Sequence, residues 1–204
     1  MTPLAAYPVE ASPTGAGNRF WRARSRGPLT AELARAGRPI AYGYLDERFP
    51  LSAYQTVFAT RPGSAEMPSA GRPFTTELVT LLVSRGIAIA PVTLHTGLSS
   101  QEVGEGPPPE WFEVPETTAR LLNAARVAGG RIVAVGTTVT RALASAVDPS
   151  GLVVGRRDWT DPQASHLLLV EAVAGADLTR AAYDAAERGG YLWHEFGDSC
   201  VFLR

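Results

Sequence analysis

The chain has 204 residues, of which 45% are hydrophobic and 19% charged, with a formal net charge of −1. This composition is typical of an ordinary globular protein, and the net charge does not favour binding to nucleic acid. No apolar run approaches the ~20 residues that cross a bilayer, and the first residues lack the pattern of a secretory signal. Cys200 is the only cysteine, which excludes an internal disulfide and a cysteine-cluster metal site and indicates a reduced, cytoplasmic setting.

The N-terminal residues 1–37 are expected to form an irregular segment, followed by one α/β domain over residues 38–204. Residues 1–30 are rich in Pro, Gly, Ser and Arg and have little periodicity. Within this segment the pattern predicts a short strand at 20–24 and a short helix at 30–36 that ends at Gly37.

Residues 54–97 hold the densest set of groups able to bind a small molecule. The pattern predicts a strand at 54–59, a long loop rich in Gly and Pro, a helix with Thr75 as N-cap and Gly86 after its end, and a buried strand at 87–94. The candidate substrate-binding residues of this stretch are Tyr54, Gln55, Thr56, Ser64, Ser69, Gly71, Thr75, Thr96 and Gly97.

A second strand–helix unit follows. Residues 110–114 are predicted to be extended, Pro115 to open a helix, and residues 131–135 to form another buried strand before a helix at 139–146. Such alternation argues for a parallel sheet covered by helices, which binds ligands at the carboxyl ends of its strands. His95, Thr96, Gly136, Thr137 and Thr138 would lie on that rim.

The C-terminal part begins with an N-cap pattern at 158–162. Helices are expected at 163–174 and 177–188, followed by two extended pieces over 191–203. His166 is a candidate substrate-binding residue, with a partly buried structural histidine as the alternative. The three histidines lack metal-ligand spacing, so no metal site is expected.

His95 titrates in the range that acid–base catalysis needs, although a structural histidine hydrogen-bonded at a strand end is the alternative. Glu110 and Glu113 point to opposite faces if 110–114 is a strand, so only one can face a cleft, and both can be solvated surface acids. Residues 136–138 at a helix start offer backbone N–H groups and hydroxyls, which can bind oxygens of a ligand or only cap the helix.

Several short strings occur together in a fixed order. They are Tyr54-Gln55-Thr56-Val57, Pro62-Gly63-Ser64, Val92-Thr93-Leu94-His95, Glu110-Trp111-Phe112-Glu113-Val114-Pro115, Val135-Gly136-Thr137-Thr138, Trp159-Thr160-Asp161 and Gly197-Asp198. The ordered set resembles the S-adenosylmethionine:tRNA ribosyltransferase-isomerase family of queuosine biosynthesis over residues 38–204.

The resemblance implies a transferase that moves and isomerises the ribosyl part of S-adenosylmethionine onto 7-aminomethyl-7-deazaguanine in tRNA, giving epoxyqueuosine. It implies no metal or redox cofactor, and S-adenosylmethionine and tRNA as partners. The implied fold is a three-layer α/β/α domain with a largely parallel or mixed sheet, here with an N-terminal remnant of a β-barrel domain. Under it His95 and Glu110 are the expected catalytic residues. Arg141 is a candidate to bind the methionine carboxylate or a tRNA phosphate, with a solvated helix residue as the alternative, and Trp159 is a candidate to stack on adenine, with a core residue as the alternative.

The chain departs from the family pattern in three respects. It lacks the family's N-terminal segment and most of the inserted barrel, it has Arg72-Pro73 where the family usually has a histidine, and it has Pro107-Pro108-Pro109 in place of a polar triplet. The alternatives to an active enzyme are a catalytically impaired nucleoside-binding relative and one half of a split enzyme. In the latter case a partner chain or an oligomer supplies the missing segment.

Overall fold

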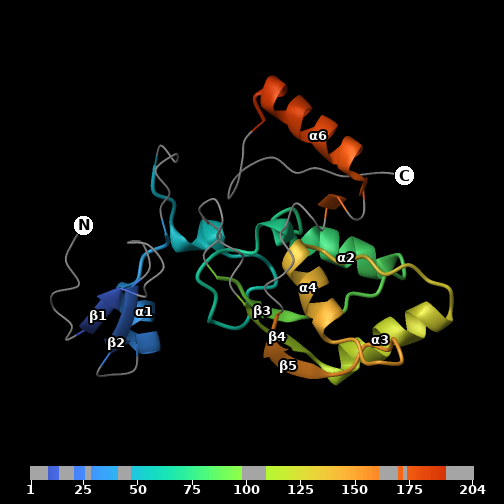
Figure 1. The fold of residues 1–204 in the computed structure, drawn as a ribbon, viewed down its shortest axis with the longest axis horizontal. Coiled ribbons are helices and arrows are strands. Elements are labelled where there is room, and N and C mark those ends of the chain that lie inside the picture. The colour runs from blue at the N-terminus through green and yellow to red at the C-terminus, as the bar shows by residue number, and fades with distance from the viewer. Residues whose placement is uncertain are drawn as a thin grey trace. The chain divides into compact units, whose positions relative to one another are not determined.

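The computed structural model describes residues 9–13, 21–25, 29–40, 47–97, 109–160, 170–171 and 174–191. Met1–Leu45 and Asp46–Arg204 form two compact units (Figure 1). Within the described ranges, none of the helices combines the length and the hydrophobicity that a bilayer crossing requires.

The first unit contains a β-hairpin followed by a helix. Strand β1 (Val9–Pro13) pairs antiparallel with β2 (Trp21–Ser25), with Val9 opposite Ser25, and α1 spans Leu29–Ala36. The predicted strand at 20–24 and helix at 30–36 are thus confirmed within one residue, whereas β1 was not expected. The Gly37 N–H donates to the Leu33 carbonyl at 2.8 Å, which ends the helix where the sequence places its stop.

The second unit mixes short strands with helices. Its elements are the 3-10 turns η2 (Leu51–Tyr54) and η3 (Ser69–Gly71), α2 (Thr76–Ser84), β3 (Thr93–His95), β4 (Trp111–Val114), α3 (Glu116–Val127), α4 (Thr137–Ser145), β5 (Arg156–Trp159) and α6 (Ala176–Gly189). The prediction that the chain contains both helices and strands, as an α/β protein, is therefore confirmed. The expected helix at 163–174 and the extended tail fall largely outside the described residues.

The sheet of this unit is antiparallel, with the strand order β3-β4-β5. His95 lies opposite Trp111, and Trp111 opposite Trp159. The expected parallel or mixed sheet is wrong for the described strands, because β4 and β5 are antiparallel to their neighbours. Asp158 and Trp159, which belong to the N-cap pattern expected at 158–162, are part of β5 and pair with β4 instead.

The core lies on one face of this sheet. Phe112 and Val114 of β4 are 0% and 1% exposed and pack against Ala119 of α3 and Ala142 of α4. Alternation along β4 sends Trp111 and Glu113 to the other face. The Thr118 hydroxyl of α3 donates to the carbonyl of Pro91 at 2.6 Å and so fixes this helix to the segment before β3.

Three predicted strands do not form over their expected lengths. Of the expected strand at 54–59, Tyr54 ends η2 and residues 55–59 form a turn. Of the expected strand at 87–94, only Thr93 and Leu94 belong to β3, and residues 131–135 do not form a strand. Val133 is 80% exposed and Ile132 43% exposed. An apolar run of β-branched residues favours an extended chain, but a strand also needs a hydrogen-bonding neighbour, and none of the described residues lies beside 131–135 as one.

The helices follow the sequence closely. The N–H of Leu78 donates to the Thr75 hydroxyl at 3.1 Å, so Thr75 caps α2 as predicted. Gly86 has φ of 77° after the end of that helix, which confirms its role as the terminating glycine. Helix α4 begins at Thr137, directly after Gly136 with φ of 101°, which is two residues earlier than expected.

Candidate active site at one end of the sheet

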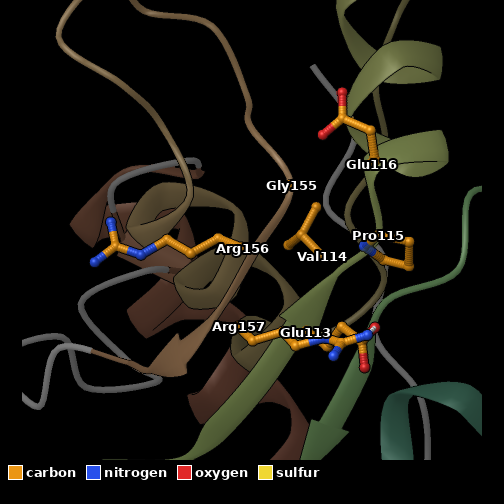
Figure 2. A pocket seen from close by; sticks show the side chains of 7 residues that line it. All are labelled: Glu113, Val114, Pro115, Glu116, Gly155, Arg156 and Arg157. Atoms are coloured by element: carbon orange, nitrogen blue, oxygen red, sulfur yellow. Dashed lines mark hydrogen bonds and ion pairs between the residues drawn. The ribbon is translucent and has the colours of Figure 1, made fainter.

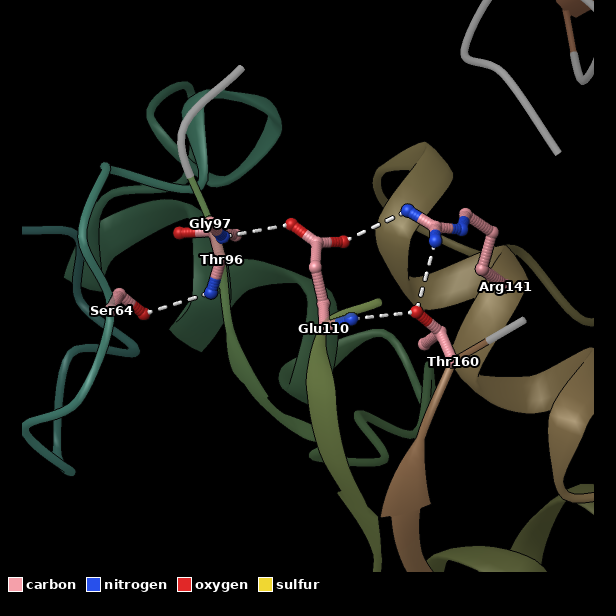
Figure 3. Close-up of polar contacts among 6 residues, drawn as sticks. All are labelled: Ser64, Thr96, Gly97, Glu110, Arg141 and Thr160. Atoms are coloured by element: carbon pink, nitrogen blue, oxygen red, sulfur yellow. Dashed lines mark hydrogen bonds and ion pairs between the residues drawn. The ribbon is translucent and has the colours of Figure 1, made fainter. Parts of the chain in front are cut away.

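Four residues from different elements form a buried polar cluster at one end of the sheet (Figure 3). One carboxylate oxygen of Glu110, before β4, accepts from the Gly97 N–H at 3.0 Å, and the other accepts from Arg141 of α4 at 3.1 Å. A second guanidinium nitrogen of Arg141 donates to the Thr160 hydroxyl at 3.0 Å, and this hydroxyl also accepts from the Glu110 N–H at 3.0 Å. These contacts tie together the ends of β3, β4 and β5, and α4.

The cluster is largely removed from water. The side chains of Arg141 and Glu110 are 4% and 11% exposed, and Thr160 is 2% exposed. The charges of Arg141 and Glu110 stabilise each other. If one were removed, the other would remain buried, with the free-energy cost of desolvation and without the attraction that offsets it. The arrangement is therefore suited to hold the strand ends in one geometry.

The loop before α2 pairs with β3 and its extension. The Ser64 hydroxyl donates to the Leu94 carbonyl at 3.2 Å and accepts from the Thr96 N–H at 3.3 Å (Figure 3). The Ala65 N–H donates to the Thr96 carbonyl at 2.9 Å, and the Thr96 hydroxyl donates to the Glu66 carbonyl at 2.5 Å. The predicted site residues Ser64, Thr96 and Gly97 are thus brought together.

His95 is enclosed by this loop and by β4. Its imidazole stacks on Trp111 with ring centroids 4.9 Å apart and an interplanar angle of 20°. Gly63, with φ of 148°, lies so close that a Cβ there would be 2.4 Å from the imidazole Cε1. The His95 Nδ1 is buried and has no hydrogen-bond partner among the described residues. A buried polar atom without a partner is uncommon and marks His95 as a candidate for proton transfer to a bound molecule.

A second group of predicted residues meets around η3. Gly71 is buried, and a Cβ on it would contact the Thr56 side chain at 3.4 Å. A Cβ on Gly136 would lie 3.3 Å from Ala70, so the start of α4 adjoins the same turn. No side chain caps α4, and the N–H groups of its first turn, at Thr137 and Thr138, have no carbonyl within the helix. Such N–H groups can bind an anionic or carbonyl oxygen.

Other predicted residues lie elsewhere. Thr75 is the cap of α2, Tyr54 is a buried residue of η2, and Gln55 is exposed beside it. Trp159 is 61% exposed on β5, opposite Trp111. His166 lies outside the described residues.

An open hollow of about 370 Å³ lies at the other end of β4 (Figure 2). Its lining residues are Glu113, Val114, Pro115, Glu116, Gly155, Arg156 and Arg157. The Glu113 carboxylate accepts a hydrogen bond from Arg157 at 2.8 Å and another from Arg61. These bonds, mainly the one from Arg157, hold the pKa of Glu113 below its ordinary value. No residue predicted to bind substrate lines this hollow, and its acidic and basic groups largely neutralise one another.

Sequence reasoning missed several members of these clusters. Thr160 joins Glu110 and Arg141, and Trp111 stacks on His95, yet neither was selected as a site residue. The usable signal for Thr160 was its place in the string Trp159-Thr160-Asp161, one of those on which the resemblance rests. The pairing of Arg61 with Glu113, 52 positions apart, left no local signal. Among the described residues, no group of three or more His, Cys, Asp or Glu side chains is arranged to hold a metal ion.

Comparison with known proteins assigns the family. The model of the family described as queuosine biosynthesis protein matches residues 7–161 and 157–202. The S-adenosylmethionine:tRNA ribosyltransferase-isomerase of Gloeobacter violaceus is 36% identical over 221 aligned residues, covering 92% of this chain and 61% of that protein. The protein of the same description from Thermus thermophilus is 34% identical over 88% of this chain and 60% of its own length.

The chain spans about three fifths of the length of these curated relatives. The chain is also 31% identical to S-adenosylmethionine tRNA ribosyltransferase from Thermotoga maritima, whose crystal structure is known. The structural match covers 64% of this chain and 50% of that one. Its TM-score of 0.46 is too low to establish a common fold. On the family match and the identity to the curated relatives, the chain belongs to the queuosine biosynthesis family of S-adenosylmethionine:tRNA ribosyltransferase-isomerases.

Proposed function

We propose that this protein moves and isomerises the ribosyl part of S-adenosylmethionine onto 7-aminomethyl-7-deazaguanine in tRNA, releasing adenine and methionine. The observation that carries the proposal is the buried His95 Nδ1, which has no hydrogen-bond partner among the described residues and lies on the strand whose end Glu110 and Arg141 hold in place. This reaction needs a group that accepts a proton from the carbon beside the sulfonium or from the attacking amine, and a polar cradle for the adenosine. Family membership supports the choice of substrates.

Within this proposal His95 transfers the proton. Its Nδ1 has no partner among the described residues, and an imidazole nitrogen can accept a proton from a bound molecule or donate one to it. Glu110 was expected to be catalytic, but both its oxygens already accept hydrogen bonds, one from the Gly97 N–H and one from Arg141. We therefore assign Glu110 and Arg141 a positioning role, since their contacts hold Gly97 and Thr160 at the strand ends.

The first turn of α4 is proposed to bind the substrate's oxygen atoms. The N–H groups at Thr137 and Thr138 point along the positive end of the helix and suit a carboxylate or the ribose hydroxyls. Arg141 itself is only 4% exposed and already bound, so it is not free to bind the methionine carboxylate directly.

The test is incubation of the protein with S-adenosylmethionine and tRNA carrying 7-aminomethyl-7-deazaguanine, followed by nucleoside analysis. Epoxyqueuosine formed together with adenine supports the proposal, whereas the absence of adenine at saturating substrate contradicts it. The His95→Ala substitution should abolish turnover without unfolding the protein. Its unfolding midpoint should be close to that of a control variant, Arg120→Ala, in which an exposed side chain is removed. Turnover that is unchanged in His95→Ala would leave His95 with a structural role alone.

A second candidate function is nucleoside binding without turnover. It is favoured by the engagement of both Glu110 oxygens, which leaves the described cluster with no free carboxylate base. Calorimetric titration with S-adenosylmethionine separates the two candidates. Heat of binding without adenine release supports the second, and adenine release excludes it.

We further propose that another polypeptide segment covers residues 131–135, supplied by a partner chain or by an oligomer. The exposed apolar side chains of Ile132 and Val133 favour this, since such a run is ordinarily a buried strand. Native mass spectrometry of the purified protein and of its complexes from the source cells tests it. A monomer that is fully active alone would contradict it.

A further inference from the structure

The sheet presents a row of aromatic side chains on the face away from its core. Phe112 and Val114 point into the core, so their neighbours along β4, Trp111 and Glu113, point to the opposite face. Residues directly opposite in an antiparallel pair share a face, with Cβ atoms about 5 Å apart. His95, Trp111 and Trp159 therefore form one cross-strand row, and Glu113 and Arg157 form part of the next.

This face is covered at one side and open at the other. The loop that follows Arg61 lies over β3, with Gly63 against the His95 ring. On β5, by contrast, Trp159 is 61% exposed and the Arg157 side chain 71% exposed. The exposed indole of Trp159 is not isolated, because Trp111 lies directly opposite it on β4 and extends the aromatic surface.

The charges beside the indoles favour an anion. Glu113 is held between Arg157 and Arg61, so this part of the face carries two guanidinium groups and one carboxylate. Each arginine uses one terminal nitrogen for Glu113, and both side chains are more than half exposed. A planar guanidinium that is fixed at one edge by a carboxylate can still donate to a phosphate from its other edge.

We propose that this open face binds unpaired bases of an RNA strand, with Trp159 and Trp111 as the stacking rings and Arg157 as the phosphate contact. Aromatic rings on a sheet bind bases that are splayed out of a helix, and a cation beside them binds the connecting phosphate. Every nucleotide brings both groups at once. S-adenosylmethionine also has a base, but it brings no phosphate group for Arg157.

The proposal rests on the proposed function only for the choice of RNA as the nucleic acid, and it is tested without turnover. The probe is a fluorescein-labelled single-stranded RNA of about ten nucleotides, within the range that one single-strand binding surface covers. Fluorescence anisotropy measures binding in the absence of S-adenosylmethionine. The same sequence as a duplex is expected to bind more weakly, because paired bases cannot stack on the indoles.

The Trp159→Ala variant is expected to weaken binding of the single strand by about 5- to 100-fold, and Trp159→Phe to retain most of it. Arg157→Gln is expected to reduce the slope of log affinity against log salt by about one. The matched control is Tyr191→Ala, which removes an aromatic side chain of similar exposure, 56%, just after α6. Its binding should equal that of the unchanged protein.

Three results would overturn the inference: equal binding of single strand and duplex, unchanged binding in Trp159→Ala, or displacement of the RNA by adenosine alone. The last result would assign the face to a free nucleoside. RNA binding that depends on Trp159 in a protein without turnover would support the inference and contradict only the proposed activity. Turnover together with RNA binding that does not depend on Trp159 would support the proposed activity and contradict the inference.

Discussion

Removal of the Arg141 side chain should destabilise the protein strongly. Arg141→Met keeps much of the apolar volume but leaves the Glu110 carboxylate buried with only the Gly97 N–H, and leaves Thr160 without its guanidinium donor. Loss of one partner from a buried ion pair costs about 3–5 kcal/mol. At about 2–4 °C per kcal/mol for a chain of this size, the melting temperature should fall by about 6–20 °C.

A double-mutant cycle separates the ion pair from the packing. Glu110→Gln combined with Arg141→Met removes both charges, so the double variant should be more stable than the sum of the single changes predicts, by about 2 kcal/mol or more. The matched control is Arg120→Met on α3. Arg120 faces Glu116 at 3.9 Å, with both side chains about two-thirds exposed, and loss of this surface pair should cost less than about 0.5 kcal/mol.

The assay is urea unfolding followed by far-ultraviolet circular dichroism, with calorimetry for the melting temperature. The free energies are comparable only if the slope of unfolding against urea stays constant among the variants. If Arg141→Met and Arg120→Met cost the same small amount, the buried pair does not hold the strand ends. Additive single changes in the cycle would refute a direct coupling between Glu110 and Arg141.

Two further predictions concern the loop and the open face. Gly86→Ala carries the strain of a positive φ alone, whereas Gly63→Ala adds a Cβ 2.4 Å from the His95 imidazole, so in urea unfolding Gly63→Ala should cost about 1–3 kcal/mol more than Gly86→Ala; equal costs would refute the close contact. The hydrogen bond from Arg157 lowers the pKa of Glu113 below 4.5, so ionised Glu113 stabilises the folded state above that pH, and this contribution is lost as the pH falls through the lowered pKa. Glu113→Gln should flatten the acid limb of the stability–pH curve measured by urea unfolding, and an unchanged limb would contradict it.

Local chemistry made the helices predictable. Thr75 accepts the hydrogen bond of an N-cap, and Gly86 and Gly190 adopt the positive φ that ends a helix, because these roles depend only on neighbours within a few residues. The ordered motifs were equally local, and they predicted the family that the comparisons confirm.

The sheet was not predictable in the same way. Residues 131–135 have the composition of a buried strand, but Val133 is 80% exposed because no described strand pairs with it. Residues 156–159 carry three charged groups and were not expected to be a strand, yet β4 provides their partner. Strand formation needs hydrogen bonds to a distant segment, and single-sequence patterns carry no information about that segment.

The same division holds for the site. The sequence by itself determined the family, the helix limits and the choice of His95 and Glu110 as the residues with suitable chemistry. Only the tertiary structure decided their surroundings, because Arg141, Thr160 and Trp111 come from different elements and meet through packing. Those contacts occupy both oxygens of Glu110 and leave the Nδ1 of His95 without a described partner, which is why we propose the histidine for proton transfer.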